Sequence, residues 1–249
     1  ERSSEVIRFE GEIGRRFAHD RRAAKTGATR VIEIADSKGG SLDAALDAAE
    51  FIQWNQLSVR VLGRCQSACV ALFAASPKRQ VSPLAEIGLH RSSSILEGEA
   101  PGTVDADYAD VLRQARFSEA ILQKRLETPA EQMLTLLPTR DMSALPSIEF
   151  VHPDTYEPID AGQANLHYVA NMFAKETTEV SQVVGETLGL VIRAAPDLAS
   201  THGAELGAAF HSNDGKQFGL GMARLVQTTF QRSLREAGPD SVRDYWALE

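Results

Sequence analysis

The chain has 249 residues, of which 43% are hydrophobic and 24% charged, as in an ordinary globular protein with one large domain or a domain plus an extension. Its net charge of -8 argues against nucleic acid as the main partner, because phosphate binding requires clustered Lys and Arg. No apolar run approaches the roughly 20 residues that a membrane-spanning helix needs, so we expect a soluble chain.

The first fifth of the chain alternates strand and helix patterns. Residues 5–9 predict a strand, and a polar helix is expected to follow through about residue 25. Five basic residues of that helix are expected to form a solvated face: Arg15, Arg16, Arg21, Arg22 and Lys25. Residues 31–35 are rich in β-branched side chains and predict a second strand. Ser41 can then cap a helix whose apolar positions follow helical spacing to residue 52.

Two adjacent glycines, Gly39 and Gly40, separate this strand from its helix, and three interpretations are open. The pair can simply allow a steep turn. It can cradle a phosphate, although the P-loop and dinucleotide fingerprints are absent. It can also present backbone N–H groups to an oxyanion, since glycine has no side chain to block the approach.

A repeat of the strand-to-helix unit at residues 31–52 follows, with its strand at residues 58–62 and its helix at residues 67–76. Ser67 opens an uncharged run, so its hydroxyl is expected at the first turn of a buried helix, where free N–H groups favour negative charge. A serine hydroxyl becomes a good nucleophile only when a base takes its proton. His90, at the end of a further predicted strand (residues 84–89), is the candidate base.

The repeated alternation of strand and helix predicts an α/β fold with a largely buried sheet. Groups at the ends of successive strands would gather at one edge of that sheet. In isolation, Ser67 would equally suit close helix packing and His90 a hydrogen-bonded strand end. Their combination with the two glycines favours catalysis.

Cys65 and Cys69 bracket Ser67. A sharp elbow would bring the two sulfur atoms within reach of a disulfide, which would imply an oxidising compartment. The other interpretation, held equally, is a buried Cys69 with a partly exposed thiol at Cys65. No metal site is expected, because two thiolates without further ligands fall short of the usual four.

The region after His90 begins with a polar loop, residues 92–102, that could line a substrate groove. A long helix is expected from Thr103 to about residue 126, followed by a shorter helix at residues 128–137 that opens on a capping box. Asp141 then follows in a turn. It is either a structural residue or the third member of a triad, orienting His90.

Taken together, these motifs resemble the proteolytic subunit of the Clp protease (ClpP) and, more broadly, the ClpP/crotonase fold. The matching stretches are Ser37-Lys38-Gly39-Gly40, Gln66-Ser67-Ala68, Gly88-Leu89-His90 and Arg140-Asp141. Their order and spacing are close to those of the family over about residues 6–151. The implied fold is a spiral of repeated strand-strand-helix units.

The resemblance implies a serine endopeptidase in which Ser67 is the nucleophile, His90 the general base and Asp141 its orienting partner. Gly40 and Ala68 would supply the N–H groups of the oxyanion hole, with Gly39 shaping its turn. It also implies a peptide or protein substrate, no cofactor and a homo-oligomer. The cysteine-flanked elbow is more similar to exported bacterial ClpP-like proteins, so a periplasmic or other extracytoplasmic location is expected, with a cytoplasmic location as the alternative.

Three features depart from the family's pattern. Lys38 replaces a proline, which keeps Gly39 and Gly40 but changes the turn. The family's segment after the catalytic aspartate has no recognisable counterpart in residues 143–154. No docking motif for an unfolding ATPase is recognisable either, so an ATPase partner is not expected.

Residues 1–155 are therefore interpreted as a ClpP-like catalytic domain and residues 156–249 as a helical extension that packs on the core or on a neighbouring subunit. One or two helices are expected within residues 168–192, whereas residues 203–221 are rich in glycine and left open. An amphipathic helix is expected at residues 218–235. Its apolar positions are Leu220, Leu225, Phe230 and Leu234.

Other functions remain open at this stage. The chain could be a scaffold or binding protein that has lost turnover, or a crotonase-like acyl-CoA enzyme, since that fold also uses paired N–H groups on a thioester. A Ser/Lys dyad would have to use Lys38 or Lys78. The remaining histidines have no ligand spacing and are interpreted as surface or core residues: His19, His152, His167, His202 and His211.

Overall fold

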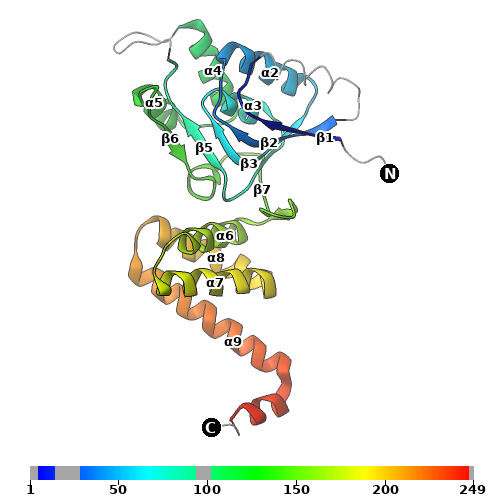
Figure 1. The fold of residues 1–249 in the computed structure, drawn as a ribbon, viewed down its shortest axis with the longest axis vertical. Coiled ribbons are helices and arrows are strands. Elements are labelled where there is room, and N and C mark those ends of the chain that lie inside the picture. The colour runs from blue at the N-terminus through cyan, green and yellow to red at the C-terminus, as the bar shows by residue number, and fades with distance from the viewer. Residues whose placement is uncertain (1–4, 15–28, 94–101, 247–249) are drawn as a thin grey trace. The chain divides into compact units, whose positions relative to one another are not determined.

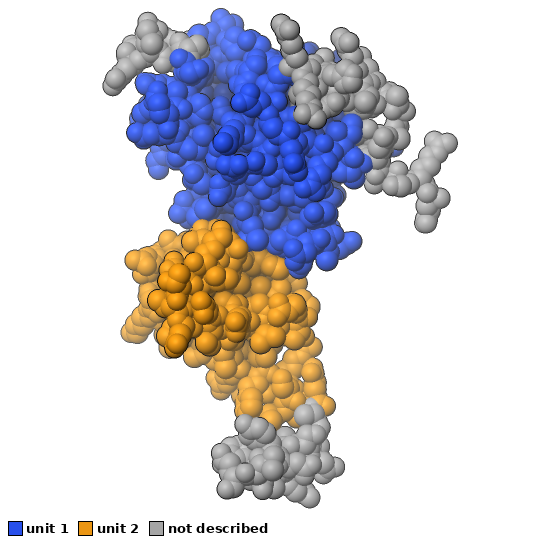
Figure 2. All heavy atoms as spheres, viewed as in Figure 1, with its two compact units in different colours: residues 1–158 blue, residues 159–249 orange. Residues whose placement is uncertain are grey.

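The computed structural model describes residues 5–14, 29–93 and 102–246, with the side chains of 237–246 excluded. The chain divides into two compact units, Glu1–Pro158 and Ile159–Glu249 (Figure 2). The polar helix expected after residue 14, its basic residues and most of the 92–102 loop lie outside the described ranges.

One sheet organises the first unit (Figure 1). Its order is β1-β2-β3-β4-β7-β8, with β5 paired to both β3 and β6. The registered pairs are parallel except β5 with β6, so the mixed α/β fold class expected from the sequence is confirmed. The strands are β1 (Glu5–Glu10), β2 (Thr29–Ser37), β3 (Ser58–Gln66), β4 (Arg79–Val81), β5 (Glu86–Leu89), β6 (Leu134–Leu136), β7 (Ile148–Val151) and β8 (Pro158–Ile159).

The strand β3 has two neighbours on the same side. Residues 59–61 pair with β4, and residues 64–66 pair with β5, where Gln66 lies opposite Gly88. On its other side, β3 pairs with β2 through Cys65 opposite Ser37. Because β2, β3 and β5 run parallel, the residues that follow these three strands emerge at one edge of the sheet.

Helices of the first unit pack on this sheet and on one another. They are α2 (Leu42–Trp54), α3 (Cys69–Ala75), α4 (Thr103–Gln114), α5 (Glu119–Glu127) and a π-helical turn, η1 (Pro138–Met142). Ser41 caps α2, as expected, by accepting a hydrogen bond from the N–H of Ala44. Every residue of α3 is buried, which explains its uncharged sequence.

Two helix predictions are corrected here. The helix expected from residue 103 to 126 is broken between α4 and α5, where Arg116 adopts a φ of 69° and Ser118 caps the new helix. The helix expected at residues 128–137 is wrong. Leu134–Leu136 instead forms β6, antiparallel to β5, because the free edge of β5 offers backbone partners that outweigh a local capping signal.

The second unit consists mainly of four helices in its described residues: α6 (Ala161–Ala174), α7 (Glu179–Ala194), α8 (Pro196–His211) and α9 (Gly215–Trp246). The glycine-rich stretch that the sequence left open lies in α8 and α9. A Cβ atom on Gly203 would lie 1.9 Å from the carbonyl oxygen of Gly162, so glycine permits α6 and α8 to pack closely.

The apolar face expected for residues 218–235 is only partly correct. Leu225 is fully buried, whereas Leu220 and Phe230 are exposed. None of the helices within the described ranges is long and apolar enough to cross a membrane.

Candidate active site

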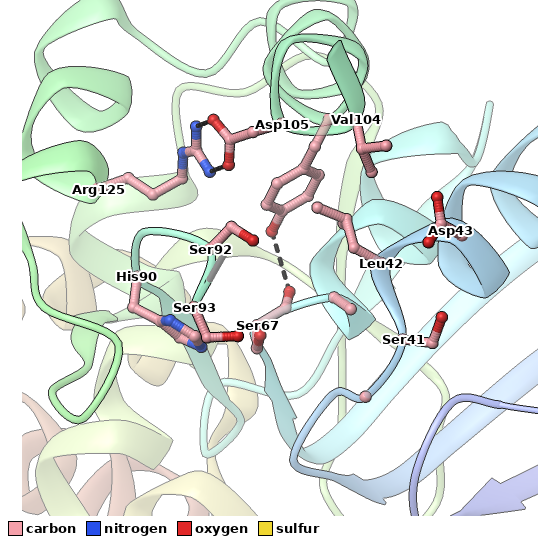
Figure 3. A pocket seen from close by; sticks show the side chains of 13 residues that line it. Ser41, Leu42, Asp43, Ser67, His90, Ser92, Ser93, Val104, Asp105 and Arg125 are labelled. Carbon is pink, nitrogen blue, oxygen red and sulfur yellow. Dashed lines mark hydrogen bonds and ion pairs between the residues drawn. The ribbon is translucent and has the colours of Figure 1, made fainter. Parts of the chain in front are cut away.

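A cavity of about 450 Å³ opens at the edge of the sheet where β2, β3 and β5 end (Figure 3). Four of the residues predicted from the sequence line it: Gly40, Ser67, Ala68 and His90. Side chains from the start of α2, from α4 and from α5 complete the lining, and they include Leu42, Val104, Asp105, Tyr108 and Arg125.

Ser67 lies in a tight elbow between the end of β3 and the start of α3. Its φ of 55° is in the left-handed region, which costs a non-glycine residue on the order of 1–3 kcal/mol. The Ser67 N–H donates to the carbonyl oxygen of Gly88, 2.8 Å away on β5. Such strain persists only where the surroundings fix it, and it is typical of functional residues.

The turn at Gly39 and Gly40 packs directly on this elbow. Their φ angles are 96° and 141°, which favour glycine. A Cβ atom on Gly39 would lie 3.1 Å from the nitrogen of Ala68, and one on Gly40 would lie 2.3 Å from the carbonyl oxygen of Ile13. Hydrogen bonds of Ile13 to the backbone on either side of Gly40 hold the turn in place. The glycines therefore provide both a steep turn and a close backbone approach.

The backbone N–H groups of Gly40 and Ala68 have no acceptor among the described residues, although both residues line the cavity. Ala68 is buried, where N–H groups are normally paired, whereas Gly40 is exposed. Two unused donors beside one cavity are suited to an anionic oxygen.

His90 follows β5 and has its Nδ1 atom 2.6 Å from the carbonyl oxygen of Arg91. A neutral imidazole with its proton on Nδ1 donates to that oxygen and leaves Nε2 as an acceptor. Figure 3 shows the side chains of Ser67 and His90 at the same end of the cavity. Within the described part of the chain no hydrogen bond joins them. Such catalytic contacts often form only when substrate is bound.

Asp141 lies in η1, and its carboxylate accepts hydrogen bonds from the Leu137 N–H at 2.8 Å and from Arg140 at 2.9 Å. It is not among the residues that line the cavity. The role of Asp141 as the partner of His90 stays a prediction.

A disulfide joins Cys65 to Cys69, with their Cα atoms 5.3 Å apart. Of the two interpretations left open by the sequence, the structure therefore has the bonded form. Both cysteines are fully buried, and the ring that they close contains Ser67. The elbow is thus fixed covalently on both sides of the candidate nucleophile.

Three residues of the site were not predicted from the sequence. The Tyr108 hydroxyl donates to the carbonyl oxygen of Ser67 at 2.9 Å. Arg125 donates two hydrogen bonds, of 2.8 and 2.7 Å, to the carboxylate of Asp105, and both side chains are buried. Asp105 and Tyr108 lie three residues apart in the sequence, a spacing that places them on one helix face and that could have indicated their common role.

No family model matches the chain, and no curated protein matches its sequence. Solved structures similar to it include three proteases. A mutant of the membrane-bound stomatin-specific protease 1510-N is 19% identical, with 60% of this chain and 79% of that chain covered and a TM-score of 0.42. The ClpP protease catalytic domain from Plasmodium falciparum is 14% identical, with 57% and 83% covered and a TM-score of 0.43. ClpP1 from Listeria monocytogenes is 18% identical, with 59% and 92% covered and a TM-score of 0.42.

The arrangement brings together a hydroxyl, an imidazole and two unused N–H groups around one cavity. These are the groups that acyl transfer requires: a nucleophile, a base and donors for the oxygen that becomes negative.

Proposed function

We propose that this chain is a serine-type peptide hydrolase with Ser67 as its nucleophile. The observation that carries the proposal is the φ of 55° at Ser67, which strains a serine at the edge of a cavity that His90 also lines. Ser147 also has a positive φ, of 59°, but does not line the cavity, so the strain distinguishes Ser67 only together with its place beside His90. The unused N–H groups of Gly40 and Ala68 support the same conclusion.

In the proposed reaction, the Ser67 oxygen attacks the carbonyl carbon of a peptide bond while His90 takes the hydroxyl proton on Nε2. The carbonyl oxygen becomes negative and accepts hydrogen bonds from Gly40 and Ala68. His90 then gives its proton to the leaving nitrogen as the C–N bond breaks. A water molecule, deprotonated by His90, then attacks the acyl carbon. The bond to the Ser67 oxygen breaks as His90 returns the proton to that oxygen, which releases the new carboxylic acid and restores Ser67.

The positive charge that His90 carries during the reaction needs a hydrogen-bond acceptor at Nδ1. The carbonyl oxygen of Arg91 occupies this position in the structure. The proposal keeps Asp141 as the orienting carboxylate, as the sequence resemblance implies. This role requires His90 Nδ1 to exchange the Arg91 oxygen for Asp141 in the active form, and Asp141→Asn tests it directly.

We further propose an extracytoplasmic location and self-association of the chain. The location is supported by the Cys65–Cys69 disulfide, because disulfides persist in oxidising compartments. Self-association rests on the resemblance of the sequence motifs alone, as does a role for residues 156–249 in packing on the core or on a neighbouring subunit.

Labelling with a fluorophosphonate tests the proposal, since this reagent phosphonylates activated serines. We expect one label per chain, located at Ser67 by mass spectrometry and absent from Ser67→Ala. Ser93→Ala is the matched control, because Ser93 lines the same cavity and should leave the label unchanged. Cleavage of a peptide library, lost in Ser67→Ala, would then identify the substrate class.

A folded protein that takes up no label at Ser67 would contradict the proposal and favour a scaffold without turnover. Saturable binding of a coenzyme A thioester to the same cavity would instead favour an acyl-CoA enzyme. Titration of Ser67→Ala with such a thioester separates these two outcomes.

A further inference from the structure

The hydroxyl of Tyr108 makes a side-chain hydrogen bond to the backbone of the candidate nucleophile. It donates to the Ser67 carbonyl oxygen at 2.9 Å (Figure 3, dashed line), and Tyr108 itself is 3% exposed. Burial raises the pKa of Tyr108 above its usual value, so the hydroxyl keeps its proton and remains a donor. Tyr108 comes from α4, far from Ser67 in the sequence.

The acceptor of this bond belongs to the same peptide group as the Ala68 N–H. In a planar trans peptide, the C=O and the N–H point in opposite directions, so fixing one direction fixes the other. The Ala68 N–H is one of the two unused donors beside the cavity. A donor on the Ser67 oxygen also polarises the peptide group and makes its N–H a stronger donor.

The Tyr108 side chain is itself held rigidly. The guanidinium carbon of Arg125 lies 5.1 Å from the centre of the Tyr108 ring, and Arg125 is fixed by its two hydrogen bonds to Asp105. Asp105 and Tyr108 lie one turn apart on α4, so the ion pair and the ring form one buried cluster.

We propose that Tyr108 is a positioning residue for the oxyanion hole, which it orients through the peptide group between Ser67 and Ala68. This inference rests on the proposed function of the site. Tyr108 does not touch the substrate's reacting atoms. It acts by aiming the Ala68 N–H at the oxygen that becomes negative in the transition state. The Val70 N–H also donates to the Ser67 oxygen, at 3.0 Å, but it belongs to the same elbow, whereas Tyr108 anchors the elbow from outside.

Tyr108→Phe is the direct test, because it removes only the hydroxyl. Loss of an entire oxyanion-hole donor lowers kcat by about 10²–10³-fold, so misaiming one donor should lower it by roughly tenfold or more. KM should stay within about twofold, since the lost interaction is made in the transition state. The second-order rate of fluorophosphonate labelling should fall in parallel.

Tyr156→Phe is the matched control. Tyr156 is in the same unit and its ring lies 5.5 Å from the guanidinium carbon of Arg60, outside the cavity lining. This variant should keep the wild-type labelling rate. The pH dependence of the labelling rate separates a positioning role from a general structural defect, which would also disturb His90. Tyr108→Phe should lower the rate at every pH and leave the midpoint of the pH profile unchanged, because His90 is unaffected.

If the wild type is labelled and folded Tyr108→Phe is labelled at the same rate, this inference is overturned and the proposed function stands. No labelling of the wild type would overturn both. Should Tyr108→Phe fail to fold, Arg125→Lys provides the same comparison. It keeps a positive charge near Asp105 but removes the planar group over the ring, and it should slow labelling in the same direction. An unchanged rate in that variant, which keeps the Tyr108 hydroxyl, would overturn the part of the inference in which Arg125 holds the Tyr108 ring.

Discussion

A Cβ atom placed on Gly39 would lie 2.7 Å from the Cβ atom of Ser67. The turn after β2 and the elbow after β3 are therefore in backbone contact, with no room for any side chain between them. This contact brings the unused N–H groups of Gly40 and Ala68 to one cavity. Substitution at Gly39 should consequently damage both the fold and the chemistry.

We expect Gly39→Ala to destabilise the protein by about 1–3 kcal/mol through its positive φ alone, with a further loss from the clash. Gly11→Ala is the matched control, because Gly11 has a φ of 111° and nothing within 4 Å of an added Cβ atom. Chemical denaturation and the Ser67 labelling rate measure the two effects. Equal losses of stability and unchanged labelling in both variants would show that the contact with the elbow is unimportant.

The Cys65–Cys69 disulfide should stabilise the elbow. A ring this short is expected to contribute about 2 kcal/mol by restricting the unfolded chain. Cys65→Ala combined with Cys69→Ala should therefore lower the free energy of unfolding by this amount and slow labelling of Ser67. When dithiothreitol is present during urea denaturation, the wild-type curve should shift toward that of the variant, and the variant's own curve should not change. A wild-type denaturation curve that does not respond to reductant would contradict this prediction.

Removing one partner of the buried ion pair of Arg125 and Asp105 should destabilise the protein far more than removing one partner of a surface pair. Asp105→Ala leaves a charged guanidinium buried without its partner, which costs about 3–5 kcal/mol. Asp110→Ala removes the carboxylate that pairs with the half-exposed Arg113, and should cost less than about 1 kcal/mol. Thermal or urea denaturation of both variants checks the difference.

The ion pair of Asp36 and Arg64 predicts a small pH dependence of stability. Hydrogen bonds from the Arg64 guanidinium lower the pKa of Asp36 below its usual 3.8. The stabilisation is thus fully present above the unfolded pKa and is lost as the pH falls through the lower folded value. Both side chains are half exposed, so the effect should stay below about 1 kcal/mol.

The wild type should therefore be slightly more stable than Asp36→Asn at pH 7, and the two should converge below pH 3.8. Urea denaturation at pH 7 and at pH 3 measures this difference, which salt should reduce. A difference that grows on acidification would have the wrong sign.

Asp141→Asn tests the third member of the triad. We expect at least a tenfold slower labelling of Ser67 with a small change in melting temperature, because a neutral amide stabilises the imidazolium less well than a carboxylate. Asp154→Asn, a change of the same kind in the loop after β7, is the control. An unchanged rate in Asp141→Asn would leave the carbonyl oxygen of Arg91 as the acceptor at His90 Nδ1.

The sequence predicted the strands and the position of the site best where local hydrophobic patterns and the parallel arrangement of strands lead to the same result. The β-branched and apolar runs before Gly39, Ser67 and His90 predicted strands, and parallel strands deliver the residues that follow them to one edge. The capping role of Ser41 and the uncharged sequence of α3 are also local signals. The α/β class follows from these elements.

Features that depend on tertiary pairing were missed or left open. A capping box at Thr128 was outweighed by the free edge of β5, which recruited Leu134–Leu136 as a strand. The hydrogen bond from Tyr108 to Ser67 joins residues on separate elements, and no pattern within α4 indicates it. Whether the cysteines are bonded depended on the geometry of the elbow between them.

The divided pairing of β3 has a consequence for redesign. Its last three residues are joined to β5, which is followed directly by His90, whereas residues 59–61 are joined to β4. Nucleophile and base are thus aligned by one short ladder that does not pass through β4 or β7. Substitutions in β4 or β7, neither of which lines the cavity, should therefore leave the reacting pair in register.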